Sequence, residues 1–184
     1  FKISKIIFEE IEDYTSINLR KIIFDNQENK LDLTQFTQIC IFACSYVIFK
    51  TFINESELNK DQINIMMGHS LGEYTALVSA GSISISDAAK LLKTRGEAMQ
   101  NAVPVGQGSM VAILGSSFED IEYFIASVDT SDGLVEIAND NAEGQVIVSG
   151  DIETVDLFQK FLKESKIKSI PLKVSAPFHC SLMK

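Results

Sequence analysis

The spacing of apolar residues divides the chain into a helical first part and a mixed second part. In the first part, apolar residues recur at the three- and four-residue intervals of amphipathic helices. This pattern predicts helices over residues 1–12, 37–52, 71–80 and 87–101, and a short strand over 63–67. The longest apolar stretch, residues 39–49, is too short to span a bilayer and favours a buried helix.

Strand and helix patterns alternate in the second part. They predict strands over 109–114, 134–138, 145–149 and 167–172, and helices over 119–127 and 151–165. The order β-α-β-β-α-β is that of a ferredoxin-like domain. We therefore expect an α/β fold, in which residues 1–105 and 173–184 form a core and residues 106–172 form an inserted ferredoxin-like subdomain.

Composition narrows the class of protein. The 184 residues are 46% apolar and carry a net charge of −9, so the chain is neither disordered nor low in complexity. An acidic chain without an arginine cluster lacks the footprint of nucleic-acid binding. Cys40 and Cys44 lie four positions apart within an apolar helix and without a zinc-ligand pattern, which favours two core thiols in a reducing compartment and no metal.

The segment Gly68-His69-Ser70-Leu71-Gly72 fits the pattern Gly-x-Ser-x-Gly between a predicted strand and a predicted helix. In such a turn the glycines relieve crowding, and the serine hydroxyl is presented at the start of the helix. The Leu71 N–H and the helix dipole then face a developing oxyanion. This context favours Ser70 as a nucleophile over an ordinary glycine-rich turn.

A serine nucleophile needs a base, and the chain has two histidines. His69 adjoins Ser70, and adjacent side chains generally point apart, so His179 is the candidate. The alternative is a surface histidine. No particular acid is indicated as a third member, and a backbone carbonyl can orient the ring instead. Cys180 is a rival nucleophile, but its adjacency to His179 argues against it.

Two cationic features carry further information. Arg95 lies on the apolar stripe of its predicted helix, where a guanidinium needs an anion. It either forms a structural ion pair or grips a substrate carboxylate with two bonds, and Gly96 leaves room for a close approach. Residues 160–173 hold five lysines and one glutamate, which is either a solvated face or a patch that attracts an acidic partner.

Several segments together resemble the malonyl-CoA:acyl carrier protein transacylase family. The resemblance rests on Thr37-Gln38, Gly68–Tyr74, Arg95-Gly96 with Met99-Gln100, Gly106–Ala112, Asn139–Asn141 with Gly144-Gln145, and Val174–His179. It implies an α/β-hydrolase-like core with an inserted ferredoxin-like subdomain. It further implies that Ser70 is the nucleophile, His179 the base, Leu71 an oxyanion donor and Arg95 the ligand of the malonyl carboxylate.

The resemblance also implies a substrate, partners and a cell compartment. Gln38 is expected to line the pocket, and Phe178 to favour malonyl over methylmalonyl. Malonyl-CoA is the expected substrate, coenzyme A the leaving group, and no cofactor is bound. Acyl carrier protein is the expected partner, docking near Lys163, Lys166 and Lys168, and neither nucleic acid nor membrane is expected. The process is fatty acid biosynthesis in the cytoplasm, with an organelle left open.

The sequence departs from the family at both ends. An upstream strand and a Gly-Gln-Gly-Ser-Gln oxyanion loop do not precede Phe1, and the family continues past His179. We therefore expect the chain to be incomplete at both ends. The alternatives are an acyltransferase domain of a larger fatty acid or polyketide synthase, a serine esterase, and a non-catalytic α/β binding module.

Overall fold

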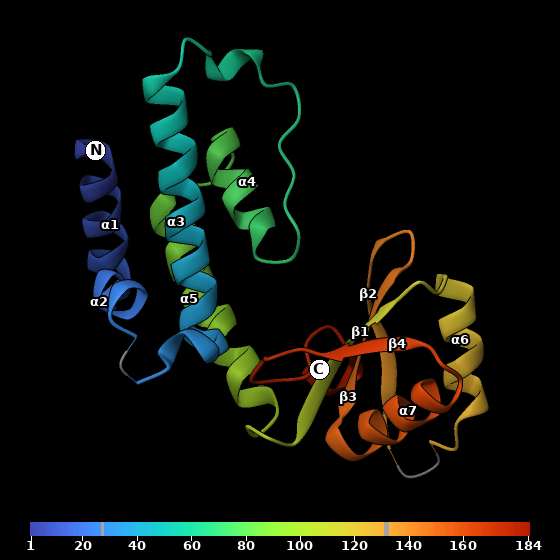
Figure 1. Cartoon of the computed structure of the whole chain (residues 1–184). Helices are drawn as coiled ribbons and strands as arrows, with labels where there is room; N and C mark the ends of the chain where they lie inside the picture. The colour runs from blue at the N-terminus through green and yellow to red at the C-terminus, as the bar shows by residue number, and fades with distance from the viewer. Residues whose placement is uncertain (27, 131–132) are drawn as a thin grey trace. The chain divides into compact units, whose positions relative to one another are not determined.

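The computed structural model describes residues 1–26, 28–130 and 133–184. Their contacts divide the chain into two compact units, Phe1–Ala98 and Met99–Lys184. Figure 1 shows the helices of the first unit and the sheet of the second.

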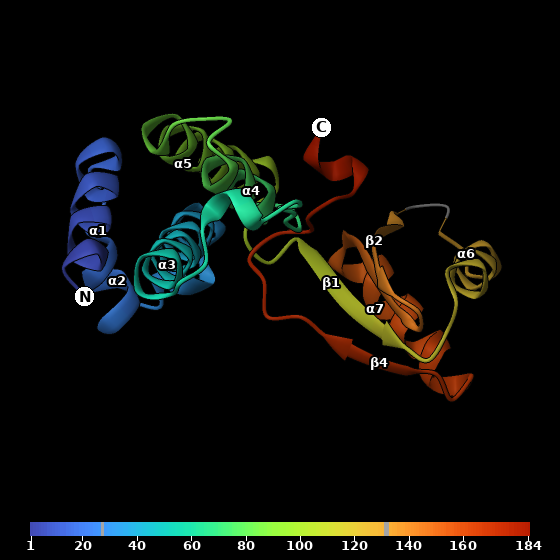
Figure 2. The same ribbon diagram turned by 90° about the horizontal axis from the view of Figure 1, so that it is seen from above.

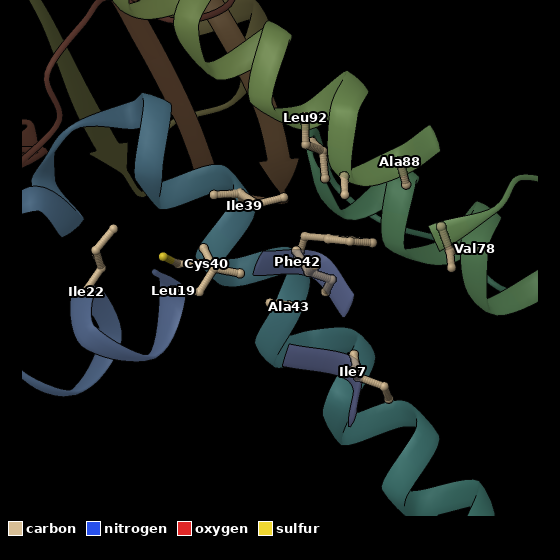
Figure 3. Packing of buried hydrophobic residues seen from close by; sticks show 12 residues of the cluster. Ile7, Leu19, Ile22, Ile39, Cys40, Phe42, Ala43, Val78, Ala88 and Leu92 are labelled. Atoms are coloured by element: carbon tan, nitrogen blue, oxygen red, sulfur yellow. The ribbon is translucent and has the colours of Figure 1, made fainter. Parts of the chain in front are cut away.

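Helices build the first unit. They are α1 (Lys2–Thr15), α2 (Leu19–Phe24), α3 (Thr34–Glu55), α4 (Gly72–Ala80) and α5 (Ile85–Ala102), with short 3-10 turns η1 (Lys30–Asp32) and η2 (Lys60–Gln62). Helix α1 lies beside α3 in both views (Figures 1 and 2). Helix α3 is central to the core, where Ile39 and Phe42 are completely buried among residues of α1, α2 and α5 (Figure 3). The four helices expected from apolar spacing are confirmed, whereas α2 was not foreseen.

Helix α3 is long and strongly apolar. Among the described residues it is the one helix long and apolar enough, by length and composition, to cross a membrane. A core helix has the same properties, and six α3 residues are buried here: Thr34, Gln38, Ile39, Cys40, Phe42 and Ala43. The expectation of a buried helix therefore holds for its first half, whereas Ile48 and Phe52 in the second half are 67% and 56% exposed.

The expected strand at residues 63–67 is wrong. These residues have no strand hydrogen bonds, and Ile65 and Met67 are 72% and 83% exposed. A β-prone run becomes a strand only when a neighbouring strand completes the ladder. No described residue supplies that partner, because the four strands of the structure form a separate sheet.

A four-stranded antiparallel sheet forms the second unit. The strands are β1 (Gly108–Leu114), β2 (Val135–Ala142), β3 (Gln145–Asp151) and β4 (Lys168–Pro171), in the order β2-β3-β1-β4. Helix α6 (Phe118–Ser127) follows β1, and α7 (Ile152–Glu164) follows β3. The predicted order β-α-β-β-α-β is confirmed. A 3-10 turn, η3 (Ser181–Met183), closes the chain.

The two faces of the sheet have different coverings. Because side chains alternate along a strand, Val111 and Ile113 of β1 face one side and Met110 and Ala112 the other. The first side packs against α6 and α7 in a cluster that includes Phe158. The second side forms a smaller cluster with Phe178. The segment that carries Phe178 therefore packs on the face of the sheet that α6 and α7 leave uncovered.

Candidate active site

Ser70 stands in a sharp turn immediately before α4. Its φ is +51°, a left-handed conformation that costs a residue other than glycine free energy. The Gly72 N–H donates to the His69 carbonyl at 2.8 Å, and the Glu73 N–H donates to the Ser70 carbonyl at 3.2 Å. The turn and the helix of the expected nucleophile elbow are present, and the strand before them is not.

The two glycines of the motif have different roles. A Cβ on Gly68 would lie 2.0 Å from the Gly72 carbonyl carbon, so no side chain fits there. A Cβ on Gly72 would meet nothing within 4 Å. The expectation that both glycines relieve crowding is thus correct for Gly68 alone. Within the part of the chain that the structure describes, the Leu71 N–H donates to no acceptor, so it can serve a ligand.

Arg95 of α5 points at the serine. Its Nη2 donates to Ser70 Oγ at 2.9 Å, and its Nη1 donates to Gln38 Oε1 of α3. Gln38 is 3% exposed, and its Nε2 donates to Thr34 Oγ1 at 3.0 Å. The side chain of Gln38, expected to line a pocket, is therefore buried and bonded to the guanidinium. Because Thr34 accepts from Nε2, the Gln38 amide oxygen is turned toward Arg95.

Close contact between α5 and α3 brings these groups together. A Cβ on Gly96 would lie 2.9 Å from the Cα of Gln35 and 3.1 Å from the Thr34 carbonyl oxygen. The absence of a side chain at Gly96 thus lets the Arg95 turn of α5 approach the first turn of α3. Thr34 was not predicted as a site residue, although it lies four positions before Gln38 on the same helix, a spacing that brings two side chains together.

His179 lies in the second unit, after β4. It is exposed, and its φ of +58° is also left-handed. A Cβ on Gly108 would lie 2.3 Å from the Pro177 ring, so Gly108 lets that ring pack against β1. Cys180 is buried and its Sγ donates to the Pro177 carbonyl at 3.1 Å, which argues further against it as a nucleophile. Ser70, Leu71, Gln38 and Arg95 thus belong to one unit, and Phe178 and His179 to the other.

The remaining thiols are unsuited to chemistry. Burial raises the pKa of Cys40 to about 12 and also raises the pKa of Cys44. Both thiols are therefore protonated at neutral pH, and a thiol is a poor nucleophile. Cys40 lies in the core as expected, whereas Cys44 is only partly buried. The described residues include no cluster of three or more His, Cys, Asp or Glu that could hold a metal.

The expected docking lysines lie on the surface of the second unit. Lys163, Lys166 and Lys168 are all exposed. Lys163 and Lys168 line a shallow hollow of about 480 Å³ together with Lys160, and Asp156 also borders it. Three cations at one hollow make a local positive surface on an acidic chain.

Known proteins with similar sequences show the family to which the chain belongs. The model of the family described as acyl transferase domain matches residues 7–184, and the chain belongs to this family. Individual relatives within this family carry a more specific name than the family does. The chain is 39% identical to the malonyl CoA-acyl carrier protein transacylase of Bacillus subtilis over 182 residues, covering 98% of this chain and 56% of the relative. The corresponding Staphylococcus aureus (strain COL) protein is also 39% identical, over 91% of this chain and 53% of its own length.

Solved structures agree with these relatives. FabD from Acinetobacter baumannii is 39% identical with a TM-score of 0.92, over 100% of this chain and 57% of that one. A type II PKS acyl-carrier protein in complex with its malonyl-transacylase matches at 35% identity and a TM-score of 0.90, over 100% and 58%. The chain thus has the mixed α/β fold of these acyltransferases and spans about half the length of the curated relatives it matches.

Proposed function

We propose that this chain transfers a malonyl group from coenzyme A to the phosphopantetheine thiol of acyl carrier protein through a malonyl-Ser70 intermediate. The observation that carries the proposal is the 2.9 Å contact of Arg95 Nη2 with Ser70 Oγ. In a malonyl thioester the free carboxylate lies one methylene from the carbonyl that Ser70 attacks. A guanidinium that reaches the nucleophile also reaches this carboxylate, and its two N–H groups match the two oxygens.

In the first half-reaction, Ser70 Oγ attacks the thioester carbonyl while His179 takes the hydroxyl proton. The oxyanion is stabilised by the Leu71 N–H and the dipole of α4. The tetrahedral intermediate collapses, the C–S bond breaks, and His179 returns the proton to the coenzyme A sulfur. This scheme requires the His179 ring within about 2.6–3.2 Å of Ser70 Oγ during reaction.

In the second half-reaction, acyl carrier protein takes the place of coenzyme A. His179 removes the proton of the phosphopantetheine thiol, the sulfur attacks the acyl-serine carbonyl, and the C–O bond to Ser70 breaks. The proton then returns to Ser70 Oγ. The transacylase relatives that are named for acyl carrier protein, and the carrier-protein complex among the similar structures, support this acceptor. The exposed Lys163, Lys166 and Lys168 are the proposed docking surface.

The proposal also assigns supporting roles and parts of the fold. Gln38 holds Arg95 in place, and Phe178 favours malonyl over methylmalonyl. Residues 106–172 are the ferredoxin-like subdomain, which the strand order β2-β3-β1-β4 supports. Residues 1–105 with 173–184 are the α/β-hydrolase-like core, and Phe178 and Ser181 of its last segment also contact the sheet. The enzyme serves fatty acid biosynthesis in the cytoplasm and needs no bound cofactor.

Intact mass after incubation with malonyl-CoA tests the proposal, with acetyl-CoA as the matched control. We expect a malonyl adduct on Ser70, little acetyl adduct, and no adduct on Ser70→Ala. Holo acyl carrier protein should then remove the adduct much faster than water does. Rapid loss of the adduct to water, with no gain from carrier protein, would instead identify an esterase. An adduct that persists on Ser70→Ala would show that another residue is the nucleophile.

A further inference from the structure

A carboxylate on the sheet holds the chain just after His179. Glu136 of β2 accepts two hydrogen bonds from Ser181, one from its backbone N–H at 2.7 Å and one from its Oγ at 2.8 Å. The two residues are 45 positions apart in sequence. Ser181 follows His179 by two residues and begins η3. These two hydrogen bonds hold the backbone next to His179, the candidate base, against the sheet.

The left-handed backbone of His179 requires contacts that hold it in place. A left-handed conformation at a residue other than glycine persists only where its surroundings fix it. On the N-terminal side of His179, the Pro177 ring packs at Gly108 and the Phe178 ring packs on the sheet. On the C-terminal side, the bonds from Ser181 to Glu136 provide the fixed point. The φ of +58° at His179 lies between these two anchors.

We propose that Glu136 is a positioning residue for His179, acting through Ser181. The inference rests on the proposed function, which makes His179 the base. A carboxylate suits the role because it has two oxygens that can accept hydrogen bonds, and here each oxygen accepts one from Ser181. Without them the turn relaxes toward a right-handed or extended backbone, and the imidazole of His179 changes its direction relative to the sheet.

The first experiment compares Glu136→Ala and Glu136→Gln with Asp140→Asn, which alters an exposed carboxylate on the same strand. We expect kcat for malonyl transfer to fall about 10²-fold in Glu136→Ala, because a displacement of about 1 Å at a catalytic group costs that factor. Glu136→Gln keeps one acceptor and should lose less. KM for malonyl-CoA and the preference for malonyl over acetyl should stay unchanged, as should all values for Asp140→Asn.

A second experiment separates positioning from a general structural role. In a His179→Ala background, Glu136→Ala should cause no further loss of the residual rate, because a residue acting through His179 has nothing left to act on. A further loss there, or a Glu136→Ala enzyme as fast as the wild type, overturns the inference. A His179→Ala enzyme that keeps full activity would instead overturn the assignment of the base in the proposed function.

Ser181→Ala supplies the mild variant in case Glu136→Ala does not fold. It removes the Oγ bond and keeps the backbone bond, so kcat should fall by less than in Glu136→Ala, and the double variant should equal Glu136→Ala alone. NMR of the imidazoles gives a readout besides activity, since the chain holds two histidines. Ser181→Ala and Glu136→Gln should shift the His179 signals and leave those of His69 in place, and unshifted His179 signals count against the inference.

Discussion

The turns that present Ser70 and His179 share a left-handed backbone and differ in what holds it. At Ser70 the means are local, since Gly68 allows the backbone at Gly72 to approach within a five-residue motif. At His179 the means are distant in sequence. Gly108 on β1 receives Pro177, and Glu136 on β2 binds Ser181. A left-handed backbone at a residue other than glycine can thus be held either by a short motif or by contacts with a sheet.

The difference predicts how each turn fails. The Ser70 turn depends on its own few residues, so a change within the motif should disrupt it and changes elsewhere should have little effect. The His179 turn depends on contacts with the sheet, so changes on β1 or β2 should move His179 while leaving the Ser70 turn intact. Paired substitutions can separate the two cases.

The largest expected effect is that of Gly68→Ala, with Gly72→Ala as its control. The added Cβ would lie 2.0 Å from the backbone at Gly72, so the turn must open. We expect malonyl transfer to fall about 10³-fold, since loss of one oxyanion donor alone costs about 10²–10³. Unfolding free energy should fall by about 3 kcal/mol. Gly72→Ala, in open space, should keep the fold and be neutral or stabilising by about 0.5–1 kcal/mol.

Steady-state kinetics and thermal unfolding of the two variants check this prediction. Equal effects of the two substitutions would show that the crowding is not confined to Gly68, and that the turn depends on both glycines as sequence analysis first expected.

The next largest effect is expected from a change on β1 that disturbs the His179 turn. Gly108→Ala should push the Pro177 ring away from β1 and lower kcat about 10²-fold, the cost of about 1 Å at a catalytic group. Pro177→Ala removes the obstacle, so the double variant should recover part of the activity lost in Gly108→Ala. Serine labelling by a fluorophosphonate should slow in Gly108→Ala, whereas the malonyl-to-acetyl preference should not change. If the double variant has the same kcat as Gly108→Ala, contact between the new Cβ and the Pro177 ring is not the cause of the loss.

This contrast also marks the limit of what the sequence predicts. The four longer helices of the first unit and the helix and strand order of the second unit followed from apolar spacing, and the Ser70 turn followed from a five-residue motif, because these features are local. Gln38 was found through the family resemblance, but its contact with Arg95 was not, because that contact joins two helices. Glu136 gave no signal at all, since its partner lies 45 residues away and a single glutamate in a strand has no distinctive pattern.

The strand at residues 63–67 failed for a related reason. Its β-propensity is a local property, but strand formation needs a partner, and periodicity carries no information on whether one is present. Apolar spacing also predicted a buried stripe on α5 that includes Ala88, Leu91 and Leu92, and the structure differs at Leu91. Ala88, Leu92 and Gly96 are buried, whereas Leu91 is 50% exposed. Spacing thus placed Arg95 near the buried face, but the contacts that hold it there needed the structure.

A smaller effect tests the Ser70 unit on its own. Arg95→Ala should lower malonyl transfer at least about tenfold, because a charged hydrogen bond is worth about 1.5–3 kcal/mol. Acetyl transfer, which has no carboxylate, should change little. Gln38→Met removes the acceptor that fixes Arg95, so it should reduce the malonyl preference by less, and it should add nothing in an Arg95→Ala background. Equal losses for both acyl groups would make Arg95 a structural residue.

The smallest expected effect belongs to the lysine surface, and it distinguishes the two units by substrate. If the Ser70 unit selects the acyl group and the second unit binds the acceptor, then Lys163→Glu and Lys168→Glu should raise only the KM for acyl carrier protein. Each should raise it by a factor of about 1.4 to 5, since an exposed ion pair contributes about 0.2–1 kcal/mol. The effect should shrink with added salt, because the Debye length falls to about 3 Å at 1 M.

Lys5→Glu on α1 is the matched control, because it reverses an exposed cation of the first unit. A change in malonyl-CoA kinetics, or the same KM shift in Lys5→Glu, would show that net charge is responsible and that the second unit holds no docking surface.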